Sequence, residues 1–260
     1  MELSAKATSV EEILPWRDMY RLEMSCQIIH DSIHGRPGWT HEYFLFANGI
    51  KVGYGSIAVS GPWKGKPTIY EWYVVPQHRT RMFDLFSALL TVSGAVAIET
   101  QSNDPLLTVM LHAFAPSVIS ESVLFHDKLT TSLKPRDAVV RRATKADAAQ
   151  IRSHELDSEA RWVVEAKGKV AGAGDILFHY NRPYGDIYMK VAEPFRERGL
   201  GSYLVQELKR ICYENGNVPA ARCNPKNIAS RKTLQKAGFV PCGHILVGSV
   251  SPADNANDMR

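Results

Sequence analysis

Long apolar runs are missing from this sequence of 260 residues. The longest mostly apolar stretch, residues 87–98, is too short to cross a bilayer and is interrupted by Ser93 and Gly94. The first twelve residues contain no basic segment followed by an apolar core, so we expect no secretory signal. These absences predict a protein with no membrane partner.

Cysteine is scarce, and charge of one sign is not in excess. The four cysteines form no CxxC pair, and the nine histidines do not join them at metal-ligand spacing, so we expect no metal site. Reduced cysteines fit a cytoplasmic location. The 31 basic and 27 acidic residues leave a net charge of +4, too little to indicate a nucleic-acid partner.

An internal repeat is the main organisational feature of the chain. Gly49, Gly53 and Gly55 have the same spacing as Gly168, Gly172 and Gly174. Further matches follow in the same order: Ile69-Tyr70 with Ile187-Tyr188, Pro76 with Pro194, and Arg79-Thr80-Arg81 with Arg196-Glu197-Arg198. We interpret this order as two copies of one fold, although an unrelated α/β first domain with chance matches is the alternative.

Each copy is predicted to be a mixed α/β domain, with a mostly antiparallel sheet flanked by helices. The first domain is assigned to residues 1–132, the second to 137–250, and a polar tail to 251–260, with a linker within Asp127 to Asp137. In the second copy, apolar periodicity predicts a helix over Gly199 to Asn215 and strands over Tyr184 to Ala192 and Val218 to Cys223. In the first, Val10 to Ile33 reads as mainly helical.

The turn between Val191 and Ser202 has the composition of an anion site. A strand is followed by two glycines, Gly199 and Gly201, that open a helix whose first N–H groups are unpaired. Arg196 and Arg198 add positive charge beside them, so the turn could hold a pyrophosphate. A plain strand-to-helix turn is the alternative.

These residues resemble the GNAT superfamily of N-acetyltransferases. Arg196-x-x-Gly199-x-Gly201 matches the family signature Q/R-x-x-G-x-G/A, and Asn227-x-x-Ser230 with Lys236-x-Gly238-Phe239 resembles its second block. The resemblance covers roughly residues 139–250. It implies acetyl-CoA as cosubstrate, and a cofactor-binding set of Lys190, Val191, Arg196, Arg198, Gly199, Leu200, Gly201, Ser202 and Asn227. A backbone N–H at Lys190 or Val191 would polarise the thioester, while Asn227 is equally well explained as a helix N-cap.

The first copy departs from this signature. Met82 and Asp84 stand where the second copy has Gly199 and Gly201. A methionine would crowd a phosphate, and a carboxylate at a helix start would repel it. We therefore predict a degenerate first copy that does not bind acyl-CoA.

The resemblance does not supply an acid or base. Family members often carry a tyrosine four residues after the serine of the second block, but this chain has Leu234 there. Asp186 and Tyr188, two residues apart on one strand face, are the predicted catalytic residues, and Glu165 is a further base candidate. Each could instead be an exposed or structural side chain, and His154 and His179 are weaker candidates.

The sequence thus favours an N-acetyltransferase that moves acetyl from acetyl-CoA to a primary amine, either a small molecule or a peptide, in a ternary complex. A non-catalytic CoA-binding or regulatory protein is the alternative, favoured by Leu234 and by the altered first copy. The oligomeric state is left open.

Overall fold

The computed structural model describes residues 2–28 and 30–250, so the predicted polar tail lies outside the described residues. The chain forms two compact units. Unit 1 consists of Met1–Glu121 and Gly243–Arg260, and unit 2 of Ser122–Cys242. Within the described part of the chain, no helix has the length and apolar character needed to cross a membrane.

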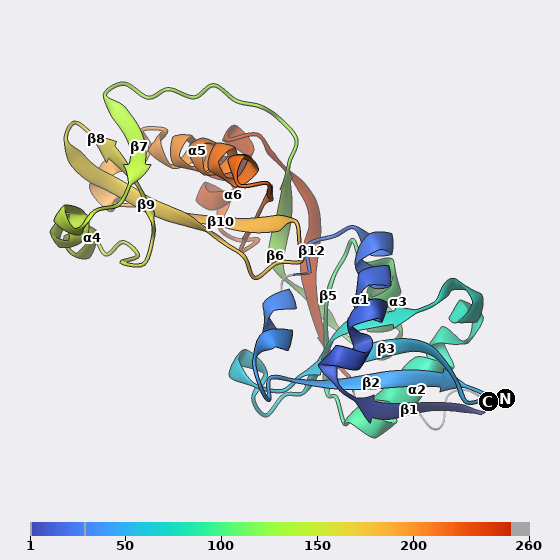
Figure 1. Cartoon of the computed structure of the whole chain (residues 1–260). Coiled ribbons are helices and arrows are strands. Elements are labelled where there is room, and N and C mark those ends of the chain that lie inside the picture. Colours follow the sequence, from blue (N-terminus) through green and yellow to red (C-terminus); the bar gives the residue numbers. More distant parts are fainter. Residues whose placement is uncertain (1, 29, 251–260) are drawn as a thin grey trace. The chain divides into compact units, whose positions relative to one another are not determined.

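Unit 1 is a mixed sheet with helices on its faces (Figure 1). Its strand order is β1-β2-β3-β4-β5-β12, and only β4 and β5 run parallel. Helix α1 lies over the face that carries Tyr54 and Glu71, and α2 packs on the face that carries Gly55. The elements are β1 Leu3–Thr8, α1 Val10–Met24, η1 Asp31–Gly35, β2 Thr40–Ala47, β3 Ile50–Ala58, η2 Gly61–Trp63, β4 Thr68–Val74, η3 Pro76–Arg81, α2 Met82–Ser93, β5 Ala97–Gln101, α3 Pro105–Phe114 and the end of β12 Phe239–Ser249.

Unit 2 has the same architecture, with strand order β6-β11-β10-β9-β8-β7 and one parallel pair, β10 with β11. Helix α5 packs on one sheet face beside Val164 and Ala171, while α4 packs on the other beside Val163 and Val170 (Figure 1). The elements are β6 Val118–Asp127, β7 Ala138–Arg142, η4 Lys145–Asp147, α4 Ala148–Ser153, β8 Trp162–Ala166, β9 Lys169–Leu177, β10 Tyr184–Val191, η5 Glu193–Phe195, α5 Leu200–Glu214, β11 Val218–Cys223 and α6 Ile228–Lys236.

The order of elements confirms that the chain carries two copies of one fold. Each copy begins with a strand and a helix. Three more antiparallel strands then lead into a short 3-10 helix, a longer helix, a parallel strand, a further helix and a last strand. Even a side-chain contact repeats. The Nε atom of Arg79 donates to the Val74 carbonyl oxygen at 2.9 Å, and that of Arg196 donates to the Val191 carbonyl oxygen at 3.3 Å.

The repeated glycines have a packing reason. A Cβ atom at Gly53 would lie 2.1 Å from the Tyr73 carbonyl oxygen, and one at Gly172 would lie 2.8 Å from the Lys190 carbonyl oxygen. Both distances are below van der Waals contact, so in each copy the neighbouring strand lies too close for any side chain. The repeat visible in the sequence is therefore a repeat of backbone contacts.

The last strands are exchanged between the two copies. Strand β12 ends the second copy, yet Ile245–Ser249 pairs with β5 in unit 1. Strand β6 ends the first copy, yet Val123–His126 pairs with β11 in unit 2. The predicted bounds, 1–132 and 137–250, follow the repeat along the chain, whereas the compact units follow these pairings. The bounds stay a prediction.

The helical region predicted from Val10 to Ile33 is shorter than expected. Helix α1 ends at Met24, because Ser25 takes a left-handed conformation with φ of 47° and its N–H donates to the Arg21 carbonyl oxygen. Beyond it, Cys26 packs into the unit 1 core and is 2% exposed. Burial of this residue, rather than helix periodicity, sets the path of the chain.

The predicted linker has no helix or strand over 128–137, and it lies along α5. Gln206 accepts a hydrogen bond from the Leu133 N–H at 2.6 Å. Lys209 is 5% exposed, donates to the Leu129 carbonyl oxygen at 2.9 Å, and lies 2.6 Å from a carboxylate oxygen of Asp127. A buried, paired lysine thus fixes the start of the linker to unit 2.

Candidate functional site

The backbone between β10 and α5 forms an anion cradle, here defined as residues 196–202. Glu197 and Gly199 take left-handed conformations with φ of 63° and 78°. The first bond of α5 runs from the Tyr203 N–H to the Gly199 carbonyl oxygen. The N–H groups of Leu200, Gly201 and Ser202 have no acceptor among the described residues. Successive free N–H groups at the positive end of a helix dipole can bind a phosphate.

The two glycines of the cradle serve different purposes. A Cβ atom at Gly199 would meet only the Lys236 Nζ atom, at 3.7 Å, so its left-handed backbone is what requires glycine. At Gly201, a Cβ atom would lie 3.2 Å from Met189 and 3.4 Å from Val191. Gly201 therefore lets β10 approach the first turn of α5, a reason that the sequence did not indicate.

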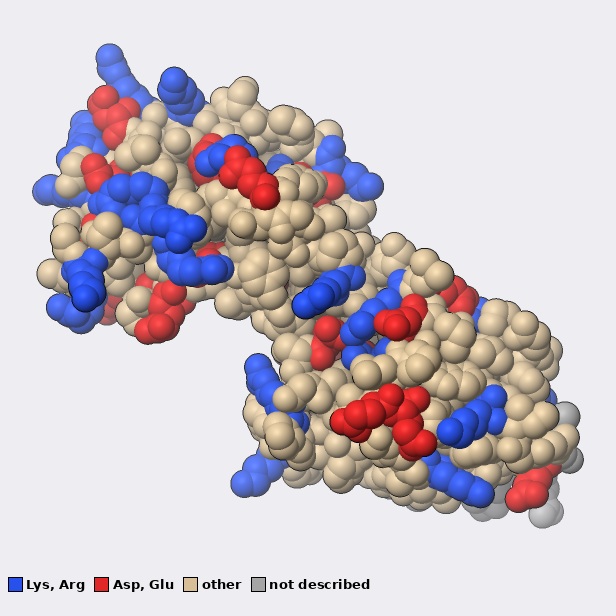
Figure 2. All heavy atoms as spheres, in the orientation of Figure 1, with Lys and Arg blue, Asp and Glu red and all other residues tan. Residues whose placement is uncertain are grey.

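Three basic side chains surround the cradle. Arg196 is held by its bond to the Val191 carbonyl oxygen, and the Arg198 guanidinium lies 5.8 Å from the centroid of the Phe195 ring. Lys236, at the end of α6, reaches the same place from another element. In the sequence, the one sign of this role is that Lys236 belongs to the second block, Lys236-x-Gly238-Phe239. Elsewhere, acidic and basic side chains are interspersed on the face that Figure 2 draws.

Strand β10 leaves its parallel neighbour before it reaches the cradle. Pairing with β11 stops at Asp186, while pairing with β9 continues to Val191. The Ala192 N–H donates to the Ala171 carbonyl oxygen on the β9 side. Because N–H groups alternate along a strand, the Lys190 N–H also faces β9 and the Val191 N–H faces the open side. Of the two N–H groups predicted to polarise the thioester, that of Val191 is the one on the open side of β10.

The predicted catalytic residues lie on the sheet face opposite α5, each with a partner of its own. Asp186 is 4% exposed, and one of its carboxylate oxygens lies 2.8 Å from His179 Nε2 and 3.5 Å from Arg222 Nε. The Tyr188 hydroxyl donates to Asp157 at 2.6 Å. Burial and the Asp157 carboxylate raise the pKa of Tyr188 above its usual range, so the phenol keeps its proton at neutral pH.

The pairing of His179 with Asp186 is a contact that the sequence did not indicate. His179 lies in the connection just after β9, and Asp186 lies on β10. A carboxylate that orients an imidazole is a common proton-transfer arrangement. Glu165, the third base candidate, instead lies 2.9 Å from Arg141, which also binds Asp147. It is part of a structural ion-pair network.

Asn227, Ser202 and Leu234 have structural roles in the fold. The Asn227 side chain accepts a hydrogen bond from the Ser230 N–H at 3.0 Å, so it caps α6. Ser202 is buried and its hydroxyl donates to the Thr233 carbonyl oxygen, which leaves only its N–H to the cradle. Leu234 is 4% exposed and packs in the core beneath α5.

The first copy has no comparable cradle. Helix η3 continues into α2 through Arg81 and Met82, whose φ values are −115° and −63°. No left-handed residue occurs over 66–93, a stretch that the structure describes throughout. Arg81 binds Asp84 at 2.8 Å, and Arg79 binds Glu23 at 2.6 Å. The two arginines that correspond to Arg196 and Arg198 are thus already neutralised.

Comparisons with known proteins agree with this geometry. Residues 128–239 match the model of the acetyltransferase (GNAT) family. Among solved structures, an acetyltransferase of the GNAT family from Colwellia psychrerythraea is 14% identical, with a TM-score of 0.72 over 96% of this chain and 100% of that one. A comparison with curated proteins gave no match.

Two further solved structures have the same arrangement over almost the whole chain. A tandem GNAT protein from the clavulanic acid biosynthesis pathway is 14% identical, with a TM-score of 0.62 over 97% of this chain and 100% of that one. A GCN5-related N-acetyltransferase from Sphaerobacter thermophilus is also 14% identical, with a TM-score of 0.60 and 96% coverage of each chain. The chain is therefore a protein of two tandem GNAT-fold units, and its residues 128–239 form a domain of the acetyltransferase (GNAT) family.

Proposed function

We propose that this protein is an N-acetyltransferase that moves an acetyl group from acetyl-CoA to a primary amine, by direct transfer in a ternary complex. The observation that carries the proposal is the anion cradle of unit 2, with three free N–H groups, directly after a strand that is open on one side. A pyrophosphate fits the first feature and an extended amide-containing chain fits the second.

The residues of the cradle fit acetyl-CoA. The N–H groups of Leu200, Gly201 and Ser202 would hold the pyrophosphate, with Gly199 leaving open space beside it. Arg196, Arg198 and Lys236 would balance its charge. The thioester supplies an activated acetyl group, and the N–H of Val191 on the open side of β10 would polarise its carbonyl. Asn227 contributes by capping α6.

Asp186 and Tyr188 are assigned to the two proton transfers. Asp186, oriented by His179, takes the proton that the amine loses as its nitrogen bonds to the acetyl carbon. Tyr188, which retains its phenol proton, donates it to the sulfur as the carbon–sulfur bond breaks. Solvent then returns the proton from Asp186 to Tyr188, so the protein ends unchanged.

The acceptor is proposed to be a small-molecule or peptide amine in the cytoplasm. All four cysteines are free thiols, in keeping with a reducing compartment. The near-balanced charge of the chain gives no support to a nucleic-acid substrate. The first copy is proposed not to bind acetyl-CoA, because its helix start is right-handed throughout and its arginines are paired.

A mass-spectrometric screen tests the proposal. The protein is incubated with acetyl-CoA and a panel of primary amines, and acetylated products are sought. We expect at least one amine to be acetylated, and Asp186→Asn to lower its turnover by about a hundredfold or more. Asp18→Asn, an exposed change in α1, is the matched control. If no amine is acetylated above the uncatalysed rate, the transferase proposal fails.

A further inference from the structure

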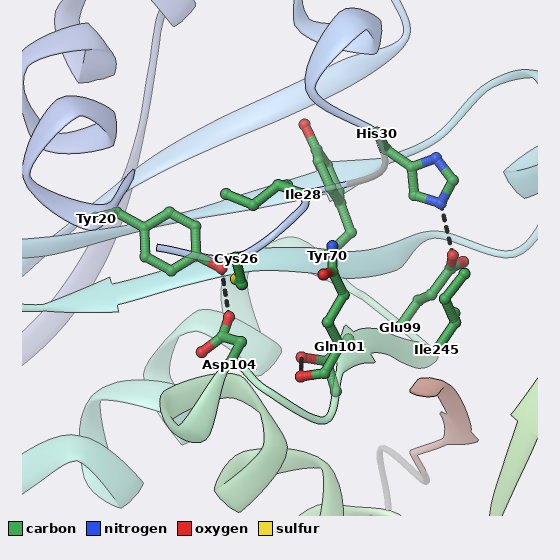
Figure 3. Close-up of a pocket in the computed structure, with 10 residues that line it drawn as sticks. Tyr20, Cys26, Ile28, His30, Tyr70, Glu99, Gln101, Asp104 and Ile245 are labelled. Carbon is green, nitrogen blue, oxygen red and sulfur yellow. Dashed lines mark hydrogen bonds and ion pairs between the residues drawn. The ribbon is translucent and has the colours of Figure 1, made fainter. Parts of the chain in front are cut away.

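Unit 2 has a large cavity outside the anion cradle. Its volume is about 600 Å³, within the range of small-molecule sites. By contrast, the cavity beside Gln101 in unit 1 (Figure 3) has about 20 Å³, which is room for a single water molecule. The large cavity is lined by residues of 143–152, which include η4 and α4, and of 158–161, which lead into β8. We call it the α4 cavity.

Part of the wall of the α4 cavity is apolar and fixed by the fold. Ile151 of α4 and Ala160 both line it, and they are 4% and 3% exposed. The two residues belong to the buried cluster between α4 and the sheet. This wall is therefore already formed in the absence of a ligand, and it can contact an alkyl chain.

Charge of one sign lines the rest of the α4 cavity. Lys145, Arg152 and Arg161 are lining residues, and none of the described residues in the lining is Asp or Glu. Arg161 is already paired with Asp175, at 2.7 Å. None of the ion pairs among the described residues involves Lys145 or Arg152. The cavity thus carries two positive charges that no carboxylate balances, and these charges favour an anion.

Acidic residues next to the cavity along the chain bind other partners. Asp147, in η4, is buried and lies 2.8 Å from Arg141. Asp157, which precedes the second lining segment, accepts a hydrogen bond from the Tyr188 hydroxyl. Neither carboxylate is therefore available to balance the charge of the lining.

The α4 cavity is next to the residues assigned to proton transfer. Asp157 binds Tyr188, and the following residue, Ser158, lines the cavity. Asp175 pairs with Tyr188 across β9 and β10, and its carboxylate binds Arg161 on the other side. Because neighbouring strands are about 4.8 Å apart, the wall at Arg161 lies about 10 Å from β10. A short alkyl chain spans that distance.

We propose that the α4 cavity binds a carboxylate or phosphate group that the acceptor amine carries at the end of a short alkyl spacer. Lys145 and Arg152 bind this anionic group, and the apolar wall contacts the spacer. The amine then reaches Asp186 and Tyr188 on β10. The inference rests on the proposed function, because it takes the amine end as the acetyl acceptor. It names the substrate class as amines with a distant anionic group, in place of plain alkylamines.

The test is an NMR titration of the intact ¹⁵N-labelled protein without acetyl-CoA. The amide resonances of Ser158 and Ala160 report on the cavity that these residues line. We expect 6-aminohexanoate to shift them saturably, and hexylamine, which lacks the anion, to bind about tenfold more weakly. Tighter binding of 6-aminohexyl phosphate than of 6-aminohexanoate would identify the anion as a phosphate, and the reverse order would identify a carboxylate.

A double variant, Lys145→Gln with Arg152→Gln, removes both unbalanced charges. We expect it to bind 6-aminohexanoate about tenfold more weakly and hexylamine as before. Both side chains are exposed, so the variant should fold. The matched control is Lys167→Gln with Lys169→Gln, two exposed changes in the turn after β8 that remove the same charge outside the cavity. It should keep the wild-type affinity for 6-aminohexanoate.

Two results would overturn the inference. Equal binding of hexylamine and 6-aminohexanoate to the wild type would show that the cavity does not select an anion, and this comparison needs no variant. Unchanged affinity in the folded double variant would remove the two assigned cations. Because binding is measured without turnover, these results would leave the transferase proposal in place. A protein that binds 6-aminohexanoate in the cavity but acetylates no amine would instead overturn the proposed function.

Discussion

Gly199 takes a left-handed backbone conformation directly before α5, where three N–H groups find no acceptor in the part of the chain that the structure describes. Asparagine and aspartate tolerate this conformation better than other side chains, and they differ only in charge. We predict that Gly199→Asp weakens acetyl-CoA binding by about tenfold or more, because its carboxylate competes for the anion site. Calorimetric titration measures the loss.

Gly199→Asn is the matched control for this charge effect. It imposes the same strain, on the order of 1 kcal/mol, and the two variants should therefore show similar melting temperatures. If Gly199→Asn loses acetyl-CoA binding as severely as Gly199→Asp, then shape rather than charge governs the cradle. If both retain normal binding, the cradle has been placed at the wrong residues.

The side chain of His34 is buried in unit 1 between two carboxylates. Its ring nitrogens lie 3.2 Å from Glu42 and 3.3 Å from Glu71, and Nε2 also contacts the Tyr70 hydroxyl. Burial and the nearby Arg17 lower the pKa of His34, but Glu71 and Glu42 raise it more, to about 9. The folded protein thus holds this proton more tightly than the unfolded chain, in which a histidine has a pKa of about 6.5.

Charged His34 should make the folded protein less stable at high pH than at neutral pH. The stabilisation from charged His34 is complete below about pH 6.5 and is lost as the pH rises through about 9. We predict that the free energy of unfolding falls across this window by up to about 3 kcal/mol more in the wild type than in His34→Gln. Urea titrations at several pH values measure the slopes. The exposed His112→Gln should keep the wild-type slope.

At the scale of elements, the close contact between β3 and β4 makes a prediction for unit 1. A methyl group at Gly53 would lie 2.1 Å from a backbone oxygen of β4, which cannot move without breaking the sheet. We predict that Gly53→Ala lowers the free energy of unfolding by about 3 kcal/mol. Gly35→Ala, where nothing lies within 4 Å, should change it by less than about 1 kcal/mol. Equal effects of the two changes in urea titrations would contradict this explanation of the repeat.

Elements defined by local patterns could be predicted from the sequence. The helix expected over Gly199 to Asn215 is α5, Leu200–Glu214, and the strand expected over Val218 to Cys223 is β11 with the same bounds. Side-chain periodicity and a helix-stopping Gly216 are local properties. The exchange of β6 and β12 could not be predicted, because each strand could pair within its own copy without changing any local pattern.

The candidate site also combines local features, which the sequence indicates, with tertiary contacts, which it does not. The cradle residues are contiguous, so their types and order already indicated an anion site. Lys236 reaches the cradle from another helix, and His179 gains its meaning only from its distance to Asp186. The reason for Gly201 is also tertiary, since it depends on how closely Met189 approaches α5.

Over residues 2–28 and 30–250, the chain has two copies of one fold, and the cradle described above lies in the second copy. We predict that calorimetry finds one acetyl-CoA per chain, and that Gly199→Asp weakens this single binding event by about tenfold or more. Two equivalent sites would show that the first copy binds the cofactor despite Met82 and Asp84. A residual site of unchanged affinity in Gly199→Asp would place the binding in unit 1 instead.

The exchanged strands make the compact units discontinuous in sequence, which can be tested by truncation. The family match begins at residue 128, yet Val123–His126 of β6 pairs with β11, and Asp127 neutralises the buried Lys209. A fragment of residues 128–250 would expose the β11 edge and leave the lysine without its carboxylate. We predict that this fragment fails to unfold cooperatively, whereas residues 118–250 unfold cooperatively and bind one acetyl-CoA. Circular dichroism melting and calorimetry compare the two fragments, which differ by ten residues. Equal melting of both would mean that β6 is dispensable for unit 2, and that residues 128–250 form a folding unit without it.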